Sequence, residues 1–347
     1  MKKILKWVRY GRSMALPQSV MPAVLAVVMA TASGNFHIGY ALLAVLGVAC
    51  AHLAMNIADD WFDYRVDMLS DRDRVIRKGF RAMTVKYPYL TDGTETLRTT
   101  AYAIAQFIVV ALACGAGIFV YWTELGGFAS NPQGTWILVA IVLICAFLGV
   151  FYSAPPFKLA YHGFGEPIIG FIFGPLLMCG TFYASCGSLG WDIIFMSVPV
   201  GLLVLNILFT HSFIDMPGDA ESNKMTFARL LGTNKACLVA SALFSFLPFA
   251  IVVAGVVLGL VHPLFLVVLL DLPRAIWLWR SLLDFSRGVQ RDFSVMPRWM
   301  GPMAMWDDIR KAGVEWFMAR WYGSRNILSG FCLLAMTAAL IIRIFAL

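Results

Sequence analysis

The chain has 347 residues, of which 60% are hydrophobic and only 14% are charged. So little charged surface excludes an ordinary soluble domain and predicts an all-α polytopic membrane protein. The formal net charge is +7, but the basic residues are spread over separate loops, so they indicate membrane topology and attraction to anionic lipid headgroups rather than nucleic-acid binding.

Apolar stretches close to the ~20 residues that cross a bilayer occur nine times, so we predict about nine transmembrane helices. They lie at about 14–33, 38–58, 100–122, 135–152, 166–186, 192–212, 237–259, 262–283 and 326–346. The first stretch is long and has no small-residue cleavage site, which argues against a cleaved signal peptide. The seven cysteines lie in or beside the spans without a Cys-x-x-Cys pair, which favours packing.

The distribution of lysine and arginine predicts the orientation. Basic residues occupy the N-terminal arm and the connections after spans two, four, six and eight, whereas the loops at 33–37, 123–134, 187–191 and 260–261 contain none. We therefore predict a multi-pass protein of the inner (cytoplasmic) membrane, with its N-terminus inside and its C-terminus outside.

The first acidic cluster follows the second span and reads Asp59-Asp60-Trp61-Phe62-Asp63-Tyr64-Arg65-Val66-Asp67. If this segment is helical, one stripe at 3.6 residues per turn carries Asn56, Asp60, Asp63 and Asp67, with Asp59 alongside. Mg²⁺ commonly takes a few carboxylates and completes its coordination with water and substrate phosphate, so this stripe fits a diphosphate site. The alternative is a solvated acidic helix end paired with Arg65, Arg72 and Arg74.

The second acidic cluster follows the sixth span and contains Asp215 and Asp219. Pro217 and Gly218 lie between them and are expected to distort or end the helix, so the pair can lie on irregular backbone beside a cavity. Lys224 and Arg229 follow closely enough to bind phosphate oxygens. Two acidic clusters on the same predicted side, each with nearby cations, favour a metal-assisted diphosphate site.

The four-span spacing of the clusters hints at a duplicated four-helix unit around one central cavity. The connection at about 68–98 is expected to cap this cavity from the cytoplasm, and residues 284–325 form a second cytoplasmic connection. Aromatic and charged residues alternate in the second connection, which suits either an amphipathic helix in the membrane interface or a helix docked on the bundle. Asp271 and Arg274 stand i,i+3 and are expected to form a structural pair.

The acidic clusters resemble the two aspartate-rich signatures of the UbiA superfamily of intramembrane aromatic prenyltransferases. Asp59-Asp60-x-x-Asp63-x-x-x-Asp67 is similar to the first signature, and Asp215-x-x-x-Asp219 with Lys224-x-Thr226 and Arg229-Leu230-Leu231-Gly232 is similar to the second. The stretches 152–166 and 56–64 resemble the branch that prenylates 1,4-dihydroxy-2-naphthoate. The resemblance extends over roughly residues 10–283, and it implies a single UbiA-type membrane domain over 1–347.

This resemblance implies a polyprenyltransferase in which Mg²⁺ assists the loss of diphosphate from a polyprenyl diphosphate, after which an aromatic carbon attacks the allylic cation. It implies Mg²⁺ binding by Asp59, Asp60, Asp63, Asp67, Asp215 and Asp219. It also implies diphosphate binding by Lys158, Lys224 and Arg229, with Arg74, Arg77 and Lys78 as further candidates. Within this set, Asp60, Asp63, Asp215 and Lys158 are the expected catalytic residues.

The acceptor expected from the resemblance is 1,4-dihydroxy-2-naphthoate, which implies a place in menaquinone biosynthesis. The alternatives within the superfamily are 4-hydroxybenzoate, haem and a glycerol phosphate. Candidates for contact with the acceptor or the allylic cation are Asn56, Tyr152, Glu166 and His211. The alternative for Tyr152 is packing, and the alternative for Glu166 is an ion pair with Lys158. The alternative for His211 is a histidine at a helix end whose hydrogen bonds are made within the protein.

A cation-coupled transporter is the alternative from another functional class, because transporters also place carboxylates on broken helices. Transporter sites are expected near the middle of the membrane. These clusters instead crowd one face beside basic residues, which favours the enzyme.

Overall fold

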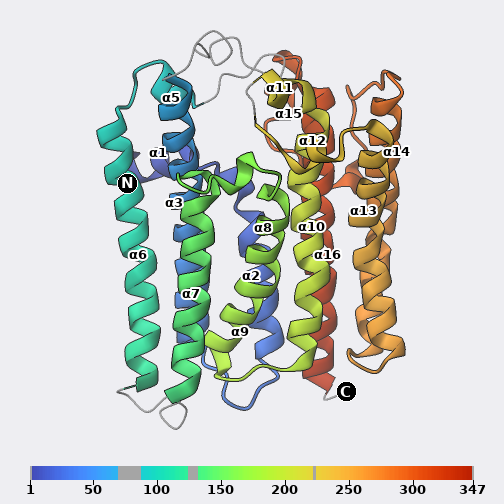
Figure 1. Ribbon diagram of the computed structural model, residues 1–347. Helices are drawn as coiled ribbons and strands as arrows, with labels where there is room; N and C mark the ends of the chain where they lie inside the picture. The colour runs from blue at the N-terminus through green and yellow to red at the C-terminus, as the bar shows by residue number, and fades with distance from the viewer. Residues whose placement is uncertain (1, 69–86, 124–131, 222–223, 346–347) are drawn as a thin grey trace.

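The computed structural model describes residues 2–68, 87–123, 132–221 and 224–345, and its long helices stand side by side in one bundle (Figure 1). Among the described residues, eight helices are long and apolar enough to cross a membrane. The expectation of an all-α polytopic membrane protein is therefore confirmed.

The first half of the chain forms α1 (Lys2–Tyr10), η1 (Ser13–Ala15), α2 (Pro17–Ala30), α3 (Ile38–Met68), α5 (Pro88–Thr91), α6 (Leu97–Thr123), α7 (Pro132–Ser153) and η2 (Leu159–Tyr161). The middle forms α8 (Gly165–Phe171), the π-helix η3 (Ile172–Leu176), α9 (Leu177–Cys186), α10 (Trp191–Ile214), α11 (Met216–Glu221) and α12 (Phe227–Leu231). The last part forms α13 (Asn234–Val257), η4 (Pro263–Asp271), α14 (Leu272–Ser286), η5 (Arg298–Met300), α15 (Trp306–Lys311) and α16 (Glu315–Phe345).

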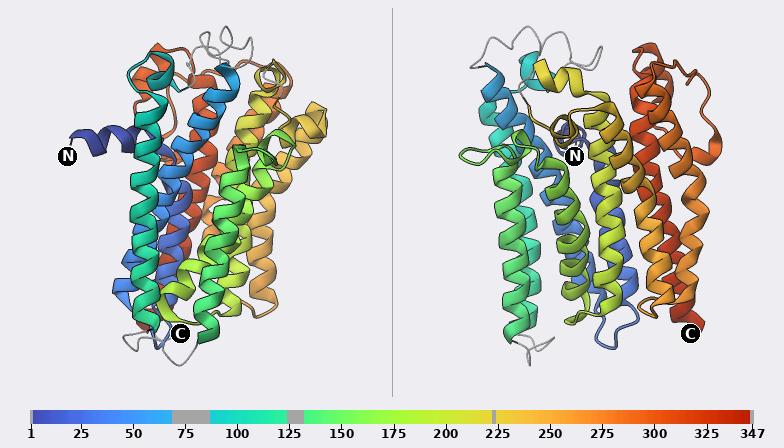
Figure 2. Two further views of the ribbon diagram at one scale, coloured as in Figure 1. Left: turned by 60° about the vertical axis from the view of Figure 1, so that its left-hand side comes forward. Right: turned by 45° about the vertical axis from the view of Figure 1, so that its right-hand side comes forward.

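The predicted eighth span, 262–283, consists of two elements, the 3₁₀-helix η4 followed by α14. Both pack against α13 and α16, and they run beside them in both views of Figure 2. Asp271 and Arg274 pair there, with Oδ1 and Nη1 2.5 Å apart, as the sequence predicts. The segment is not one of the eight candidate spans, so the count of nine crossings stays a prediction.

The helix α16 begins at Glu315, so the last part of the predicted connection 284–325 is helical, and the cytoplasmic location of this connection stays a prediction. Buried polar side chains on this helix bind backbone carbonyls: Arg320 Nη2 donates to Ser281 O at 3.1 Å, and Arg325 Nη2 donates to Pro302 O at 2.9 Å. Trp316 and Trp321 pack against the apolar core. Of the two interpretations of this connection, docking on the bundle holds for residues 315–325.

The helix α3 continues to Met68, so the first acidic cluster is helical as predicted. The short helix α1 projects sideways from the bundle (Figure 2, left). Its Tyr10 stacks on Tyr89 of α5 with ring centroids 4.4 Å apart, and Trp7 meets Tyr89 edge to face. These contacts hold the N-terminal arm and α5 near the end of α3.

Glycines allow α8 and η3 to approach α10 closely. A Cβ atom at Gly174 would lie 2.4 Å from Gly201 Cα, and one at Gly201 would lie 2.6 Å from Gly170 O. Pro175 lies within the π-helix, where a wider turn relieves the loss of its backbone N–H. Small residues spaced four apart are a common device for bringing membrane helices into contact.

We expect Gly174→Ala to destabilise the fold, because the added methyl meets backbone that cannot move aside. The cost expected for overpacking is about 1–3 kcal/mol, and the measurement is the thermal midpoint of size-exclusion retention in detergent. Gly115→Ala is the matched control, because a Cβ atom at Gly115 meets nothing within 4 Å. Equal midpoints for the two variants would contradict the close contact.

Candidate active site

The bundle contains a cavity of about 2030 Å³. Apolar side chains of α3, α6, α7 and α9 line most of it. Polar side chains line the part of the cavity near the C-terminal turns of α3. This polar end is formed by Arg12, Asn56, Asp59, Asp60, Asp63, Tyr89, Tyr152, Ser153, Glu166, His211, Asp219 and Lys224. Residues of both predicted acidic clusters therefore line one cavity.

Two side chains from other elements hold the carboxylate of Asp60, which is only 4% exposed. Arg12 Nη2 donates to Oδ1, and the Tyr89 hydroxyl donates to Oδ2 at 2.9 Å. Arg12 also lies 3.6 Å from Asp59 Oδ2, while the Ser153 hydroxyl donates to Asp59 Oδ1. The Asp60 and Asp59 carboxylates raise the pKa of Arg12, and burial together with Asp60 raises the pKa of Tyr89, so both remain hydrogen-bond donors.

Asp63 accepts a hydrogen bond of 2.6 Å from the Tyr161 hydroxyl. Two ammonium groups lie over the Tyr161 ring, with Lys224 Nζ 5.5 Å and Lys158 Nζ 5.8 Å from its centroid. Burial alone would lower the pKa of Lys224, but the charges of Asp63 and Asp59 raise it well above its usual value. Lys224 is therefore a permanent cation beside the first acidic cluster.

Lys224 reaches the first cluster because two connections of the chain lie side by side. A parallel β-bridge joins His162 to Met225, and both Oε atoms of Glu166 lie 3.2 Å from Phe227 N at the start of α12. Glu166 thus positions the second motif while it lines the cavity. This arrangement joins the stretch 152–166 to the segment after α11.

The helix is interrupted within the second cluster, since α10 ends at Ile214 and α11 begins at Met216, but the break lies at Asp215, whereas Pro217 and Gly218, the predicted cause, lie inside α11. Asp215 is 5% exposed and lies 3.9 Å from His211 Nε2, so His211 is placed to orient it. Arg229 Nη1 donates to the carbonyls of Asp219 and Lys224 at 3.2 and 2.7 Å. Arg229 therefore also fixes the backbone that presents Asp219 and Lys224.

The predicted site residues fall into three groups. Most lie at the polar end of the cavity; Lys158, Arg229 and Asp215 lie beside it without lining it. The side chain of Asp67 and the residues Arg74, Arg77 and Lys78 lie outside the described residues. The assigned roles of all these residues remain predictions.

Four polar contacts of the carboxylates were not predicted from the sequence. Arg12, Tyr89, Ser153 and Tyr161 come from four different elements or connections and lie 29 to 98 residues from the aspartates that they contact. No local spacing links them to the acidic clusters. In the sequence, Arg12 stands out only as part of the basic N-terminal arm. Tyr89 and Tyr161 stand out only because they lie in the connection 68–98 and the stretch 152–166.

The carboxylates at the polar end of the cavity offer the oxygen ligands that Mg²⁺ prefers. Among the described residues, no three side chains of His, Cys, Asp or Glu lie close enough together to hold a metal ion. Mg²⁺ does not need such a cage, because one or two carboxylates, waters and substrate phosphates complete its octahedron. Asp59, Asp60, Asp63 and Asp219 offer hard oxygen atoms at one end of one cavity, so these residues fit the ion.

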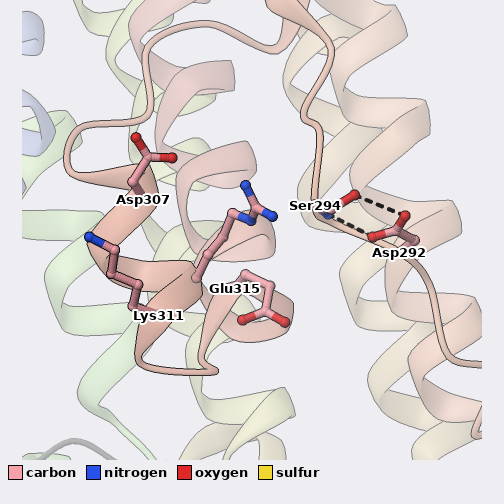
Figure 3. Close-up of a pocket in the computed structure, with 6 residues that line it drawn as sticks. Asp292, Ser294, Asp307, Lys311 and Glu315 are labelled. Atoms are coloured by element: carbon pink, nitrogen blue, oxygen red, sulfur yellow. Dashed lines mark hydrogen bonds between the residues drawn. The ribbon is translucent and has the colours of Figure 1, made fainter.

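A second hollow of about 540 Å³ lies at the C-terminal connection (Figure 3). Its walls carry both signs of charge, from Asp292, Asp307, Arg310, Lys311 and Glu315. Asp292 turns its oxygen atoms back to Ser294, whose N–H and hydroxyl donate to it at 2.7 and 2.9 Å. These charges offset one another, so the larger cavity is the candidate active site.

Known proteins share the family and the fold of this chain. Residues 19–301 match the model of the UbiA prenyltransferase family. The 1,4-dihydroxy-2-naphthoate octaprenyltransferase of Bacillus subtilis is 23% identical over 260 residues, covering 75% of this chain and 78% of that protein. The protein of the same name from Mycobacterium tuberculosis is 28% identical over 233 residues, covering 67% and 72%.

A solved structure shares the fold. The UbiA homologue from Archaeoglobus fulgidus bound to DMAPP and Mg²⁺ superposes with a TM-score of 0.53 at 17% identity, over 93% of this chain and 99% of that chain. At this identity the likeness concerns the fold alone. The family match over most of the chain and the shared bundle lead to one conclusion: the chain belongs to the UbiA prenyltransferase family and is a multi-pass membrane transferase.

Proposed function

We propose that this enzyme transfers a polyprenyl group from a polyprenyl diphosphate to 1,4-dihydroxy-2-naphthoate, with the help of Mg²⁺. One observation carries the proposal: both acidic clusters and Lys224 line the polar end of a single cavity whose other walls are apolar. A diphosphate with a long apolar tail has the same division into a charged head and an apolar chain.

The polar end suits the ionisation of the donor. Asp60, Asp63 and Asp219 would hold Mg²⁺ directly or through water, with Asp59, Asp67 and Asp215 in support, and the ion would neutralise charge on the departing diphosphate. Lys224 adds a fixed positive charge for the same oxygen atoms. The C–O bond breaks with its electron pair on the diphosphate, and the apolar walls keep water away from the allylic cation.

The acceptor then attacks the allylic carbon through a ring carbon. With a naphthoate acceptor, the carboxylate leaves as carbon dioxide and its bonding electrons return to the ring, which restores aromaticity. Tyr152 lines the cavity and is only partly exposed, so its ring is placed to stabilise the cation. The names of the Bacillus and Mycobacterium relatives support the naphthoate, and 4-hydroxybenzoate is the second candidate.

We further propose that the enzyme lies in the cytoplasmic membrane with its polar cavity end toward the cytosol, where soluble aromatic acceptors are available. The asymmetric distribution of Lys and Arg between the loops supports this orientation. In Figure 1 the C-terminus lies at the opposite end of the bundle from α5, α11 and α12, in agreement with it.

We expect Asp60→Asn and Asp215→Asn each to lower turnover by at least about a hundredfold, because each removes a negative charge that would neutralise the metal. The measurement is prenyl transfer by purified protein with saturating Mg²⁺. Asp192→Asn is the control, since Asp192 lies in the first turn of α10, at the far end of that helix from Asp215. Turnover near that of the wild type in either site variant would refute the assigned metal role.

The orientation predicts the result of reporter fusions. A reporter that is active only in the cytoplasm should work when it is fused after residue 85 or 290 and fail after residue 128, because those loops differ in basic charge. The opposite pattern would place the polar cavity end on the wrong side of the membrane.

The mass of the product tests the acceptor. With 1,4-dihydroxy-2-naphthoate we expect a prenylated naphthol that is lighter by one carbon dioxide than the simple adduct, since the carboxylate is the group that is replaced. Mass spectrometry of the organic extract measures it. Prenylation of 4-hydroxybenzoate without reaction of the naphthoate would overturn the choice of acceptor and leave prenyl transfer intact.

A further inference from the structure

Two polar side chains lie on the cavity wall away from the acidic clusters. His52 of α3 and Gln18 of α2 both line the cavity, and each is only 7% exposed. His52 stands seven residues before Asp59 on the same helix, which places it about 10 Å back along the helix axis. Uncharged polar groups in an apolar wall cost free energy unless something binds them.

The hydrogen bonds of His52 determine which of its nitrogen atoms faces a ligand. The Ser19 hydroxyl lies 2.6 Å from His52 Nδ1 and 3.2 Å from the carbonyl of Leu16. A serine hydroxyl has one proton, so when it donates to Leu16 it must accept from Nδ1–H. We assign His52 this tautomer, which leaves Nε2 as a hydrogen-bond acceptor.

Neither side chain is fully satisfied within the protein. In the described part of the chain, Ser19 is the sole hydrogen-bond partner of the His52 side chain, and the Gln18 amide has none. The Gln18 amide offers two donors and an acceptor. A buried amide without a partner and an available imidazole nitrogen, on two helices that line the same cavity, point to a ligand that carries a hydroxyl group.

An aromatic surface adjoins this pair. The Phe173 ring of η3 lines the cavity, and its centroid lies 5.1 Å from that of His52 with the planes inclined by 43°. An aromatic ligand can pack against the ring of Phe173 while its edge reaches His52 Nε2. This part of the cavity wall therefore offers an aromatic ring, that of Phe173, and a hydrogen-bond acceptor, Nε2 of His52.

We propose that His52, Gln18 and Phe173 form the subsite that recognises the hydroxylated ring of the acceptor, with Ser19 as the positioning residue for His52. His52 Nε2 accepts the hydrogen bond of a ring hydroxyl, and the Gln18 amide binds a second polar group of the acceptor. The subsite rests on the proposed function, because it assumes a hydroxylated aromatic acceptor. It makes acceptor selection depend on residues outside both aspartate-rich motifs.

The test is equilibrium binding without prenyl diphosphate, so that it does not depend on turnover. Wild-type protein should bind 1-hydroxy-2-naphthoate about tenfold more tightly than 2-naphthoate, as expected for one buried hydrogen bond. His52→Leu should reduce this ratio to about twofold or less, and His52→Gln should restore most of it, because glutamine can still accept. Gln18→Leu should weaken the binding of both ligands while the wild-type affinity for polyprenyl diphosphate is kept.

Ser245→Ala is the control, because Ser245 accepts a buried hydrogen bond from Asn206 and does not line the cavity. It should keep the wild-type ratio. An unchanged ratio in folded His52→Leu protein, or equal wild-type binding of the two ligands, overturns the subsite. If the products instead identify 4-hydroxybenzoate as acceptor, the choice of naphthoate fails, and the same measurement with 4-hydroxybenzoate and benzoate decides the subsite.

Discussion

Buried carboxylates at one end of an apolar bundle are the constraint on which the other features depend. Asp60, Asp63 and Asp219 are 4%, 7% and 7% exposed, and a membrane protein tolerates such groups only when partners compensate their charge. Arg12 and Lys224 supply positive charge, and tyrosines supply hydrogen bonds. Three features bring these partners to the carboxylates. Arg12 of the N-terminal arm contacts Asp60 of α3, and the chain breaks at Asp215 between α10 and α11. The two connections that contain His162 and Met225 pair through a β-bridge.

The spans differ in how deeply the bundle buries them. In the apolar stretch of α10, 72% of the residues are buried, and this helix contacts η3 through glycine backbone. In the apolar stretches of α6 and α7, only 17% and 6% of the residues are buried. Close packing on one side fixes the helices that end in the second acidic cluster. On the other side, α6 and α7 are more exposed, and part of their apolar surface lines the cavity, where a long prenyl chain would fit.

The sequence predicts the parts of this protein that depend on local periodicity. Apolar runs located the spans, and the 3.6-residue stripe placed Asp60 and Asp63 on one face because α3 stays helical past the apolar run. The contact of Arg12 with Asp60 joins residues 48 apart, and no local pattern encodes it. The carbonyl partners of Arg320 and Arg325 in α16 lie 39 and 23 residues away, and no local pattern encodes these contacts either.

If both acidic clusters serve the proposed reaction, they would hold a metal ion only together with the diphosphate, because the described side chains form no cage of three ligands. Mn²⁺ in place of Mg²⁺ makes this visible by electron paramagnetic resonance. We predict tight Mn²⁺ binding only when a non-reactive polyprenyl diphosphate analogue is present, with phosphorus hyperfine coupling that is lost in Asp219→Asn. Mn²⁺ binding of equal strength without the analogue, or bound Mn²⁺ without phosphorus coupling, would show that the clusters and the diphosphate do not share the ion.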